Sequence, residues 1–543
     1  MRPIRPLKSH MIPSTISTGL NSRSHTEYFV HPYNFLKFIL GVDLLRSSPV
    51  NIPWKALCLY YFILFSMLTS ISNPLDNKMS RPGQTAPDAF VCSVMEDHLQ
   101  CNNQQTQEEV SIAIDNIVCI LPISGDSDSG YRVLFLEAQS ESSDPQATSD
   151  YARVARIKTA SLPSTLLFRY LCRGLPRHLD SPNVNIHVVI STRSGTGKAK
   201  KVFQNVLQPF LSYLGLTGYE VHETQSAQTI TELTRSKFLP CAQLGVHQTI
   251  ILLSGDGGLV DIVDGFYSSA EEILAPPCIA LIPTGTGNAM ANSIGLLRPA
   301  LELVMLLQGK PRPMPVFAAS FSPKAQYVTN EGRDRAPICN KPVAENQHQR
   351  IYGAVVASWG IHAALVADSD TAEYRHFGTD RFKLAAKELL SPSDGSPTHR
   401  YRGMLSLTKP EGVTKKQQQH MESMQRDEHM YVLATLVSKL EREFTISPDS
   451  SPLDGCLRIV HFGPVPPDEA MRLMGQAYQG GLHVNDEIVT YTEIEGFRID
   501  FRENDERWRR VCIDGKIVAV EQGGWMEVHR EPRCLLNLVA RIP

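Results

Sequence analysis

Thr249–Gly258 reads Thr-Ile-Ile-Leu-Leu-Ser-Gly-Asp-Gly-Gly, an apolar run that ends in a glycine-rich turn. Such a run is typical of a buried strand, and a helix-like stretch follows it. The same strand-to-helix step occurs three more times between residues 184 and 312, starting at His187–Ile190, Tyr219–His222 and Cys278–Ile282. Four successive steps with short connections predict an α/β domain, in which helices cover both faces of a mostly parallel sheet.

Three of these four predicted strands end in a turn with at least two glycines: Ser191–Lys198, Ser254–Gly258 and Pro283–Asn288. In open α/β sheets ligands bind at the carboxyl ends of the strands. Glycine lets backbone N–H groups approach an anion there, and the helix that follows directs its positive end toward it. We therefore expect a nucleotide phosphate site. The alternative is that each glycine only serves its own turn or helix cap.

Asp256 lies between two glycines at a strand end, where a core role is excluded. A kinase must take a proton from the acceptor hydroxyl as that hydroxyl attacks phosphorus, and a carboxylate near the γ-phosphate can accept it. The same carboxylate could instead help to hold Mg²⁺, which prefers carboxylate and phosphate oxygens. A third alternative is an aspartate that only stabilises its turn.

Four segments resemble, in order and spacing, the motifs of the diacylglycerol kinase catalytic domain, which diacylglycerol, ceramide and sphingosine kinases share. They are Ser191–Ala199, Leu253–Gly265, Pro283–Asn292 and Ile513–Lys516. The resemblance extends over about residues 184–543. It implies an ATP- and Mg²⁺-dependent lipid kinase that works at a membrane surface, with an antiparallel β-sandwich after the α/β domain.

The segment Trp359–Phe382 is similar to the part of sphingosine kinases where an aspartate receives the polar head of the sphingoid base. By position, the resemblance assigns this role to Asp368, with Asp370 as the alternative at a two-residue shift. It assigns nucleotide phosphate binding to Arg375 and Arg381. A carboxylate suits the amine of the base, and guanidinium groups clamp phosphate oxygens. The alternative is an exposed turn with solvated charges.

Asp256 is thus the predicted catalytic residue, and no metal ligand is assigned. The predicted nucleotide-binding residues come from the three glycine turns, the two arginines and the closing motif. They are Ser191, Arg193, Gly195, Gly197, Lys198, Ser254, Gly255, Gly257, Gly285, Thr286, Gly287, Asn288, Arg375, Arg381, Asp514 and Gly515.

The chain departs from the family pattern at several positions. The first motif opens with Ser191-Thr192 instead of Asn-Pro, and the last has Lys516 where the family has glutamate. Pro315 stands where an acidic or amide residue is usual, and Asp261 and Asp264 replace glutamate and asparagine. These changes put turnover and substrate choice in doubt.

Beyond residue 312 closely spaced β-like runs predict a β-sandwich domain with loop insertions over residues 313–543. The runs include Leu535–Val539, and Ser322–Gln349 is expected to be a surface loop. Apolar residues such as Phe377 and Phe382 could line an acyl channel, although plain core is the commoner role for such residues.

The N-terminal third divides into two predicted parts. Residues 1–79 form a basic region with a short apolar segment, Ala56–Ile71, and residues 80–183 form a small β-rich regulatory module. The apolar segment has 16 residues, fewer than a bilayer span normally needs. A membrane anchor, a buried helix, or a stretch before a translation start at Met79 are the alternatives.

Composition limits the classes of function. Lys+Arg 53 against Asp+Glu 56 gives a net charge of −3, which argues against a nucleic-acid-binding protein. The 11 scattered cysteines include no CxxC pair, and predict neither a disulfide framework nor a zinc site. We expect a cytoplasmic protein associated with intracellular membranes, since these cysteines suit a reducing compartment and the resemblance implies a membrane surface.

The expected activity is phosphorylation of the primary hydroxyl of a sphingoid long-chain base. Diacylglycerol or ceramide is the alternative acceptor, and neither has a free amine. A catalytically weak lipid-binding protein on a kinase scaffold is the alternative of another class, motivated by Lys516 and Ser191-Thr192. A kinase of the NAD-kinase type acting on a soluble substrate would share the Gly-Asp-Gly turn, but it would explain neither Trp359–Phe382 nor the apolar N-terminal segment.

Overall fold

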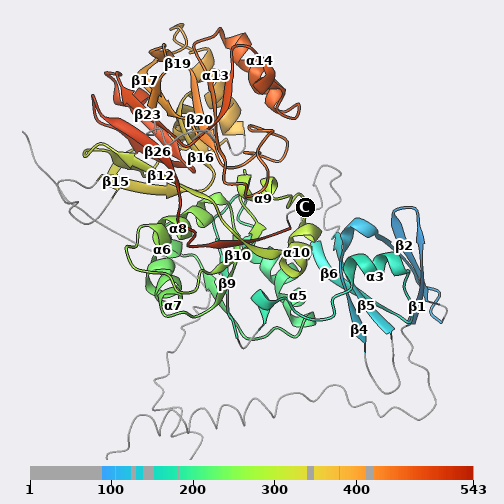
Figure 1. Cartoon of the computed structure of the whole chain (residues 1–543). Helices are drawn as coiled ribbons and strands as arrows, with labels where there is room; N and C mark the ends of the chain where they lie inside the picture. The colour runs from blue at the N-terminus through green and yellow to red at the C-terminus, as the bar shows by residue number, and fades with distance from the viewer. Residues whose placement is uncertain are drawn as a thin grey trace, which may run out of the picture. The chain divides into compact units, whose positions relative to one another are not determined.

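The computed structural model describes residues 89–103, 105–123, 130–138, 152–180, 183–338, 348–377, 380–410 and 421–541. The predicted region 1–79 lies outside these residues. Within residues 85–543, which form one compact unit, the chain builds four β-sheets (Figure 1). The helices lie mainly on the faces of the second sheet and beside the last two.

The first sheet has six strands in the order β3-β2-β1-β6-β5-β4. Its strands are β1 (Ala89–Met95), β2 (His98–Asn103), β3 (Glu109–Ala113), β4 (Ile117–Ile123), β5 (Gly130–Ala138) and β6 (Ala152–Thr159). Helix α3 (Ser164–Tyr170) packs on this sheet through Leu166 and Tyr170, and the short turns η1 (Ile114–Asn116) and η2 (Arg177–Leu179) complete this part.

A disulfide joins Cys92 to Cys101 across β1 and β2. No disulfide framework was expected from the sequence, and this single cross-strand bond was not predicted. The hairpin register places the two residues directly opposite one another, and a sequence separation of 9 does not show such a register in advance.

The second sheet is the predicted parallel sheet, with the order β11-β27-β10-β9-β7-β8. Its parallel strands pair β8 with β7, β7 with β9, β9 with β10 and β10 with β27, and β11 is antiparallel at the edge. The strands are β7 (Asn185–Ile190), β8 (Tyr219–Glu223), β9 (Gln248–Ser254), β10 (Cys278–Pro283), β11 (Lys310–Pro313) and β27 (Asn537–Ala540).

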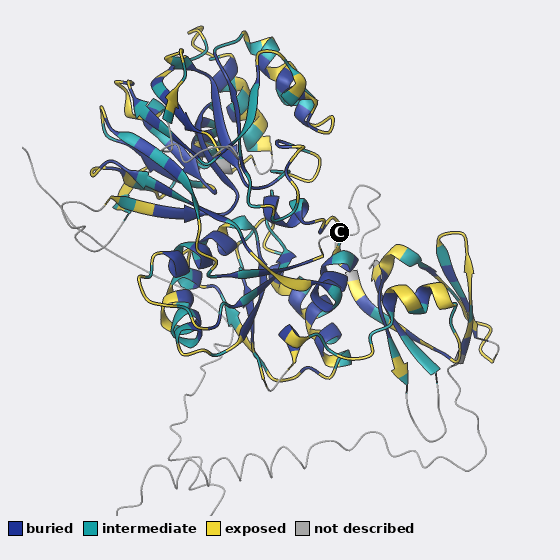
Figure 2. Cartoon of the chain, in the orientation of Figure 1, coloured by how far each residue is buried: buried dark blue, intermediate teal, exposed yellow. Residues whose placement is uncertain are grey.

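Strand β9 is buried along its whole length, because helices cover both faces of the sheet (Figure 2). Ile250 and Leu252 enter one core with α8, and Ile251 and Leu253 enter another with α10. The helical segments are α4 (Ala199–Val202), η3 (Phe203–Leu207), α5 (Gln208–Tyr213), α6 (Thr229–Leu233), η4 (Thr234–Phe238), α7 (Leu239–Gln243), α8 (Asp256–Tyr267), α9 (Ala289–Ser293) and α10 (Pro299–Gln308).

The last two sheets are antiparallel and enclose a core around Trp359, Phe317 and Phe497. One contains β12 (Val316–Phe321), β15 (Gln349–Gly353), β17 (Tyr401–Thr408), β18 (Met421–Ser423), β19 (Glu428–His429), β23 (Gly496–Phe501) and β26 (Trp525–Glu531). The other contains β13 (Gln326–Thr329), β14 (Asp334–Pro337), β16 (Val356–Gly360), β20 (Tyr431–Thr435), β21 (Leu457–Phe462), β22 (Thr490–Ile494), β24 (Arg510–Ile513) and β25 (Lys516–Ala519).

Helices α11 (Ile361–Ser369), α12 (Ala372–Arg375), α13 (Arg381–Leu390) and α14 (Pro467–Ala477), with the turns η6 (Leu482–Asn485) and η7 (Glu506–Arg509), accompany these sheets. The predicted fold class, an α/β domain followed by an antiparallel β-sandwich, is confirmed. The predicted boundaries of the four regions stay predictions.

Two local expectations are wrong. Leu535–Val539 does not join the sandwich, because β27 inserts between β10 and β11 as the dark red strand beside β10 in Figure 1. Part of Ser322–Gln349 is a β-hairpin, since β13 pairs with both β14 and β25. In both cases the partner is remote in sequence or the strand has only four residues, so periodicity alone gave no signal.

Candidate active site

The three glycine turns meet at the carboxyl ends of β7, β9 and β10. Gly255 and Gly285 approach so closely that a Cβ built on Gly285 would lie 2.4 Å from the Cα of Gly255. Gly195 has a φ of +54°, and a Cβ on it would lie 2.5 Å from the carbonyl oxygen of Thr284. Only glycine allows these contacts, so the turns form one structure.

Hydrogen bonds hold the turns together. The backbone N–H of Gly255 donates to Oγ of Ser194 at 2.8 Å, and the N–H of Thr284 donates to the carbonyl of Ser254 at 3.0 Å. Asn288 adopts a left-handed conformation with φ 54°, and its side-chain amide closes the third turn with two 2.9 Å bonds to Gly285. The turns are thus fixed before any ligand arrives.

Gly257 differs from these glycines, because nothing lies within 4 Å of the position its Cβ would take. Gly287 faces the carbonyl of Leu440 from the sandwich, with a Cβ separation of 3.1 Å. Arg193, Gly197 and Thr286, three of the predicted nucleotide-binding residues, are exposed. Oγ1 of Thr284 is buried and lacks a hydrogen-bond partner among the described residues.

Asp256 begins α8 and holds the first residues of α9. Its Oδ2 accepts the N–H of Ala289 at 2.7 Å, and its Oδ1 accepts the N–H of Met290 at 3.0 Å. Burial raises the pKa of this carboxyl, and the two amide donors oppose the rise. A carboxylate held in a fixed orientation with a raised pKa is a better proton acceptor than an ordinary surface aspartate.

Asp514 brings a second buried carboxyl from the sandwich. It has a φ of +48° in the turn between β24 and β25, and it accepts backbone N–H groups of Ala354, Val355 and Val356. Burial raises its pKa to about 7, and the negative charge of Asp256 adds to the rise. The closing motif and the Gly-Asp-Gly turn therefore lie close enough to interact electrostatically, although Asp514 itself has its oxygens turned to the backbone.

The two departures at positions 516 and 261 are partners. Nζ of Lys516 lies 2.8 Å from Oδ1 of Asp261, and both side chains are more than two-thirds buried. Burial raises the pKa of Asp261, and Lys516 opposes the rise. Asp264, the other departure on α8, accepts the N–H of Tyr352 at 3.2 Å. These residues thus bind α8 to the sandwich.

The expected substrate aspartates have different surroundings. Asp368 is almost buried, and its two oxygens pair with Arg507 at 2.9 Å and with Arg510 at 2.7 Å. Asp370 is half exposed and lies 3.4 Å from Nη1 of Arg381. Arg375 ends α12, and its side chain lies outside the described residues. The structure thus places Asp368 in an ion network and leaves Asp370 at the surface.

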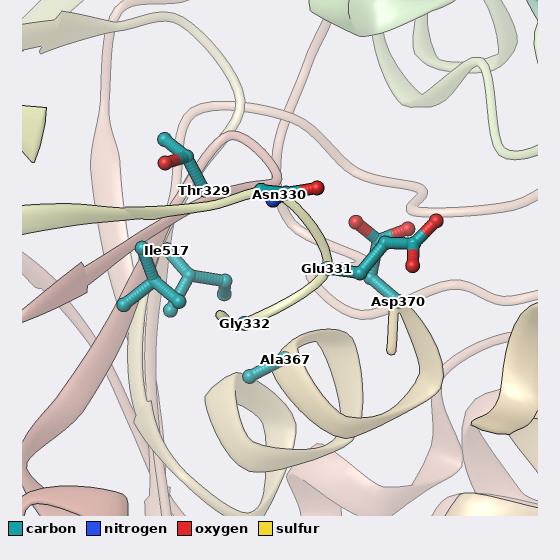
Figure 3. A pocket seen from close by; sticks show the side chains of 8 residues that line it. Thr329, Asn330, Glu331, Gly332, Ala367, Asp370 and Ile517 are labelled. Carbon is teal, nitrogen blue, oxygen red and sulfur yellow. The ribbon is translucent and has the colours of Figure 1, made fainter. Parts of the chain in front are cut away.

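A pocket of about 210 Å³ lies beside Asp370 (Figure 3). Glu331 and Asp370 stand on one side of it, and Thr329 and Ile517 stand on the other. Ile517 follows Lys516, so this pocket shares β25 with the closing motif. Ser194, Arg507 and Arg510 were not predicted from the sequence because their partners are remote. Glu331 was not predicted because no sequence motif marks it as a pocket residue.

Comparison with known proteins identifies a family for part of this chain. Residues 185–319 match the model of the diacylglycerol kinase catalytic domain. These residues belong to the diacylglycerol kinase catalytic-domain superfamily. The match includes all three glycine turns and Asp256.

Two curated proteins similar to this chain are named as sphingosine kinases. Sphingosine kinase 1 of Mus musculus is 30% identical over 222 residues, which are 38% of this chain and 49% of that protein. Sphingosine kinase B of Dictyostelium discoideum is 30% identical over 158 residues, 29% of this chain and 19% of that protein. The chain thus matches at most half the length of these relatives.

A solved structure of a putative diacylglycerol kinase from Bacillus anthracis str. Sterne is 12% identical, with a TM-score of 0.43, and covers 66% of this chain and 97% of that one. Among the described residues, no helix is both long and apolar enough to cross a membrane. The segment Ala56–Ile71 lies outside the described residues.

Proposed function

We propose that this chain is an ATP- and Mg²⁺-dependent lipid kinase that phosphorylates the primary hydroxyl of a sphingoid base. One observation carries the proposal: three glycine turns meet around a partly buried, oriented carboxylate, that of Asp256. Turns of this kind suit a nucleotide phosphate chain. The likeness to sphingoid base kinases supports the choice of acceptor.

The residues fit a nucleotide. The exposed groups Arg193, Gly197 and Thr286 and the unpartnered Oγ1 of Thr284 provide donors at the turns. Open space beside Gly257 leaves room for a phosphate at the start of α8. Mg²⁺, when bound with ATP, neutralises phosphate charge. Within the glycine turns, the carboxylate of Asp256 is the side-chain group that could help to hold this ion.

Asp256 would act on the acceptor hydroxyl. As the hydroxyl oxygen bonds to the γ-phosphorus, the bond from that phosphorus to the bridging oxygen breaks and ADP leaves. The hydroxyl proton passes to a carboxylate oxygen of Asp256, whose raised pKa favours this transfer. The amides of Ala289 and Met290 keep the carboxylate in place during the transfer.

Asp370 would receive the amine of the base. Asp368 was the first expectation, but both of its oxygens already pair with arginines. Asp370 instead lines the pocket together with Glu331, and a protonated amine suits two acidic side chains. Arg381, 3.4 Å from Asp370, would reach the phosphate from the same side.

A lipid-binding protein without turnover is the second candidate. The pair of Lys516 with Asp261 favours it, because an ammonium group and a neutralised aspartate stand where the family has two glutamates. Such a protein would bind ATP or lipid and transfer no phosphate.

Phosphate transfer from labelled ATP by the full chain tests both candidates. A sphingoid base, ceramide and diacylglycerol are offered separately, with Asp256→Asn as the inactive variant and the exposed Asp427→Asn as the matched control. We expect label in the base alone, lost in Asp256→Asn and kept in Asp427→Asn. Label only in a neutral lipid would refute the proposed acceptor. ATP binding without label in any lipid would support the second candidate.

A further inference from the structure

Three side chains with metal-binding atoms lie together at the edge of the parallel sheet. His187 belongs to β7, and Glu220 and His222 belong to the edge strand β8. The parallel register pairs His187 with Glu220, and His222 lies two residues farther along β8. Because side chains alternate along a strand, Glu220 and His222 leave the same face of the sheet.

The distances between their atoms suit one metal ion. Nε2 of His222 lies 3.4 Å from Nδ1 of His187 and 3.7 Å from Oε2 of Glu220, and the third separation is 4.0 Å. In the plane of the three atoms, the equidistant point lies about 2.2 Å from each. This is the upper end of Zn²⁺–carboxylate bond lengths and about 0.1 Å longer than Zn²⁺–imidazole bonds. Little movement is needed to close the site.

The surroundings fix two ligands and leave one side open. His187 is buried and His222 nearly so, and the ring of Phe238 from η4 packs against both imidazoles. Glu220 is more than half exposed, so water could reach a fourth position. Burial lowers the pKa of both histidines, which keeps the rings in the neutral form that metals require.

The ammonium group of Lys237 lies beside His187, Glu220 and His222, and it supplies a positive charge there. Its ammonium pairs with the same Oε2 atom of Glu220 that faces the two histidines. The positive charge compensates Glu220 when no ion is bound, and a divalent ion would have to displace it. Lys237 is therefore a competitor whose removal should strengthen metal binding.

We propose that His187, Glu220 and His222 bind a divalent transition-metal ion, with Zn²⁺ as the expected ion. Two imidazoles and one carboxylate with an open fourth position are a known zinc donor set, whereas Mg²⁺ prefers oxygen ligands only. The ion would connect β8 to β7. Its ligand on β7, His187, lies four residues before Ser191, where the first glycine turn begins. It would be separate from the Mg²⁺ that accompanies ATP.

Zinc titration of the full chain tests this site. The protein is freed of metal with a chelator, dialysed, and titrated with Zn²⁺ in competition with a chelating dye, with Mg²⁺ as a parallel titrant. We expect one tight Zn²⁺ per chain, with Mg²⁺ failing to compete. Glu220→Gln and His222→Asn should each weaken this affinity at least about tenfold, since each removes one of three ligands. Lys237→Gln should strengthen it.

His247→Asn is the matched control, because His247 is exposed and lies outside the group. Its zinc affinity should equal that of the unmodified chain. Circular dichroism of the metal-free variants shows whether they fold, and the exposure of Glu220 makes Glu220→Gln the variant that keeps the fold. Zinc affinity unchanged in Glu220→Gln, or lowered as much in His247→Asn, would overturn the proposal. Absence of tight binding to the unmodified chain would overturn it as well.

Discussion

Lys516 and Asp261 form a 2.8 Å ion pair that joins β25 of the sandwich to α8 of the catalytic domain. Each residue alone departs from the family pattern. Together, the ammonium group of Lys516 neutralises the carboxylate of Asp261 where both side chains are mostly buried. We expect Lys516→Met to lower the free energy of unfolding by about 1–2 kcal/mol, because it leaves the Asp261 carboxylate unpaired in partly buried surroundings. Urea unfolding measures the loss.

The double variant Lys516→Met/Asp261→Asn should recover most of this stability, since no unpaired charge remains. A double-mutant cycle with Asp261→Asn gives the coupling energy directly. Additive effects of the two single substitutions would contradict the pairing.

Asp256→Asn should reduce the rate of phosphate transfer by roughly 10²–10⁴-fold, the usual contribution of a positioned proton acceptor. The amide oxygen of asparagine can still accept one of the two N–H bonds from α9, whereas its NH₂ group cannot accept the other. The unfolding midpoint should therefore fall modestly, while ATP affinity should change much less than the transfer rate. Single-turnover transfer and ATP binding are measured on the same sample. Equal losses in both would assign Asp256 to folding of the turn and not to proton transfer.

Two glycine substitutions should differ in their effect on stability. Gly285→Ala places a Cβ 2.4 Å from the Cα of Gly255 and should destabilise the domain by about 2 kcal/mol or more, because two backbones must separate. Gly257→Ala meets no atom within 4 Å and lies in the first turn of α8, so the protein should keep its stability. Its ATP affinity should fall if a phosphate occupies that space. Thermal unfolding with and without ATP separates the two effects.

The carboxyl of Asp514 should make stability depend on pH. Its pKa is about 7 in the folded chain and near 3.8 when unfolded, so between these values the folded state binds more protons. The free energy of unfolding contributed by this group is therefore highest below about pH 4 and falls as the pH rises to about 7, by a few kcal/mol in total. Urea unfolding across this range should show a smaller fall for Asp514→Asn than for the unmodified chain. Parallel curves would contradict the assignment.

Asp370→Asn should raise KM for a sphingoid base about tenfold and leave transfer to a neutral lipid unchanged, because only the base carries an amine. Asp380→Asn, a neighbouring exposed aspartate, is the control and should change neither. Asp368→Asn should instead lower stability, since Arg507 and Arg510 lose their common partner. A KM effect in Asp368→Asn without loss of stability would return the amine site to Asp368.

The sequence predicted the α/β domain well because its signals are local. Ile250–Leu253 is apolar throughout, and each glycine turn follows directly on its strand, so strand, turn and helix can be recognised within one short window. The antiparallel sandwich was also predicted, from closely spaced β-like runs and from the family resemblance. Strand β27 could not be assigned to its sheet, because an apolar run of four residues suits either sheet and its partner β10 lies about 260 residues earlier.

The same difference between local and remote signals decides which residues of the candidate site could be predicted. Asp256 was found because two glycines flank it in sequence. The environment of Asp368 was missed because Arg507 and Arg510 lie about 140 residues away, and no local pattern announces an ion pair. Lys516 and Asp261 were likewise noted as two separate departures from the family pattern. Only the folded structure shows that they form an ion pair.

The insertion of β27 between β10 and β11 has a consequence for synthesis on the ribosome. The first five strands of the parallel sheet are made long before Asn537–Ala540, yet β11 has no hydrogen-bonded neighbour until that segment arrives. The edge of β10 that later pairs with β27 therefore stays without a strand partner while the whole sandwich is translated. During this interval the edge is exposed to pairing with other chains, and a chaperone that covers extended edges would protect it.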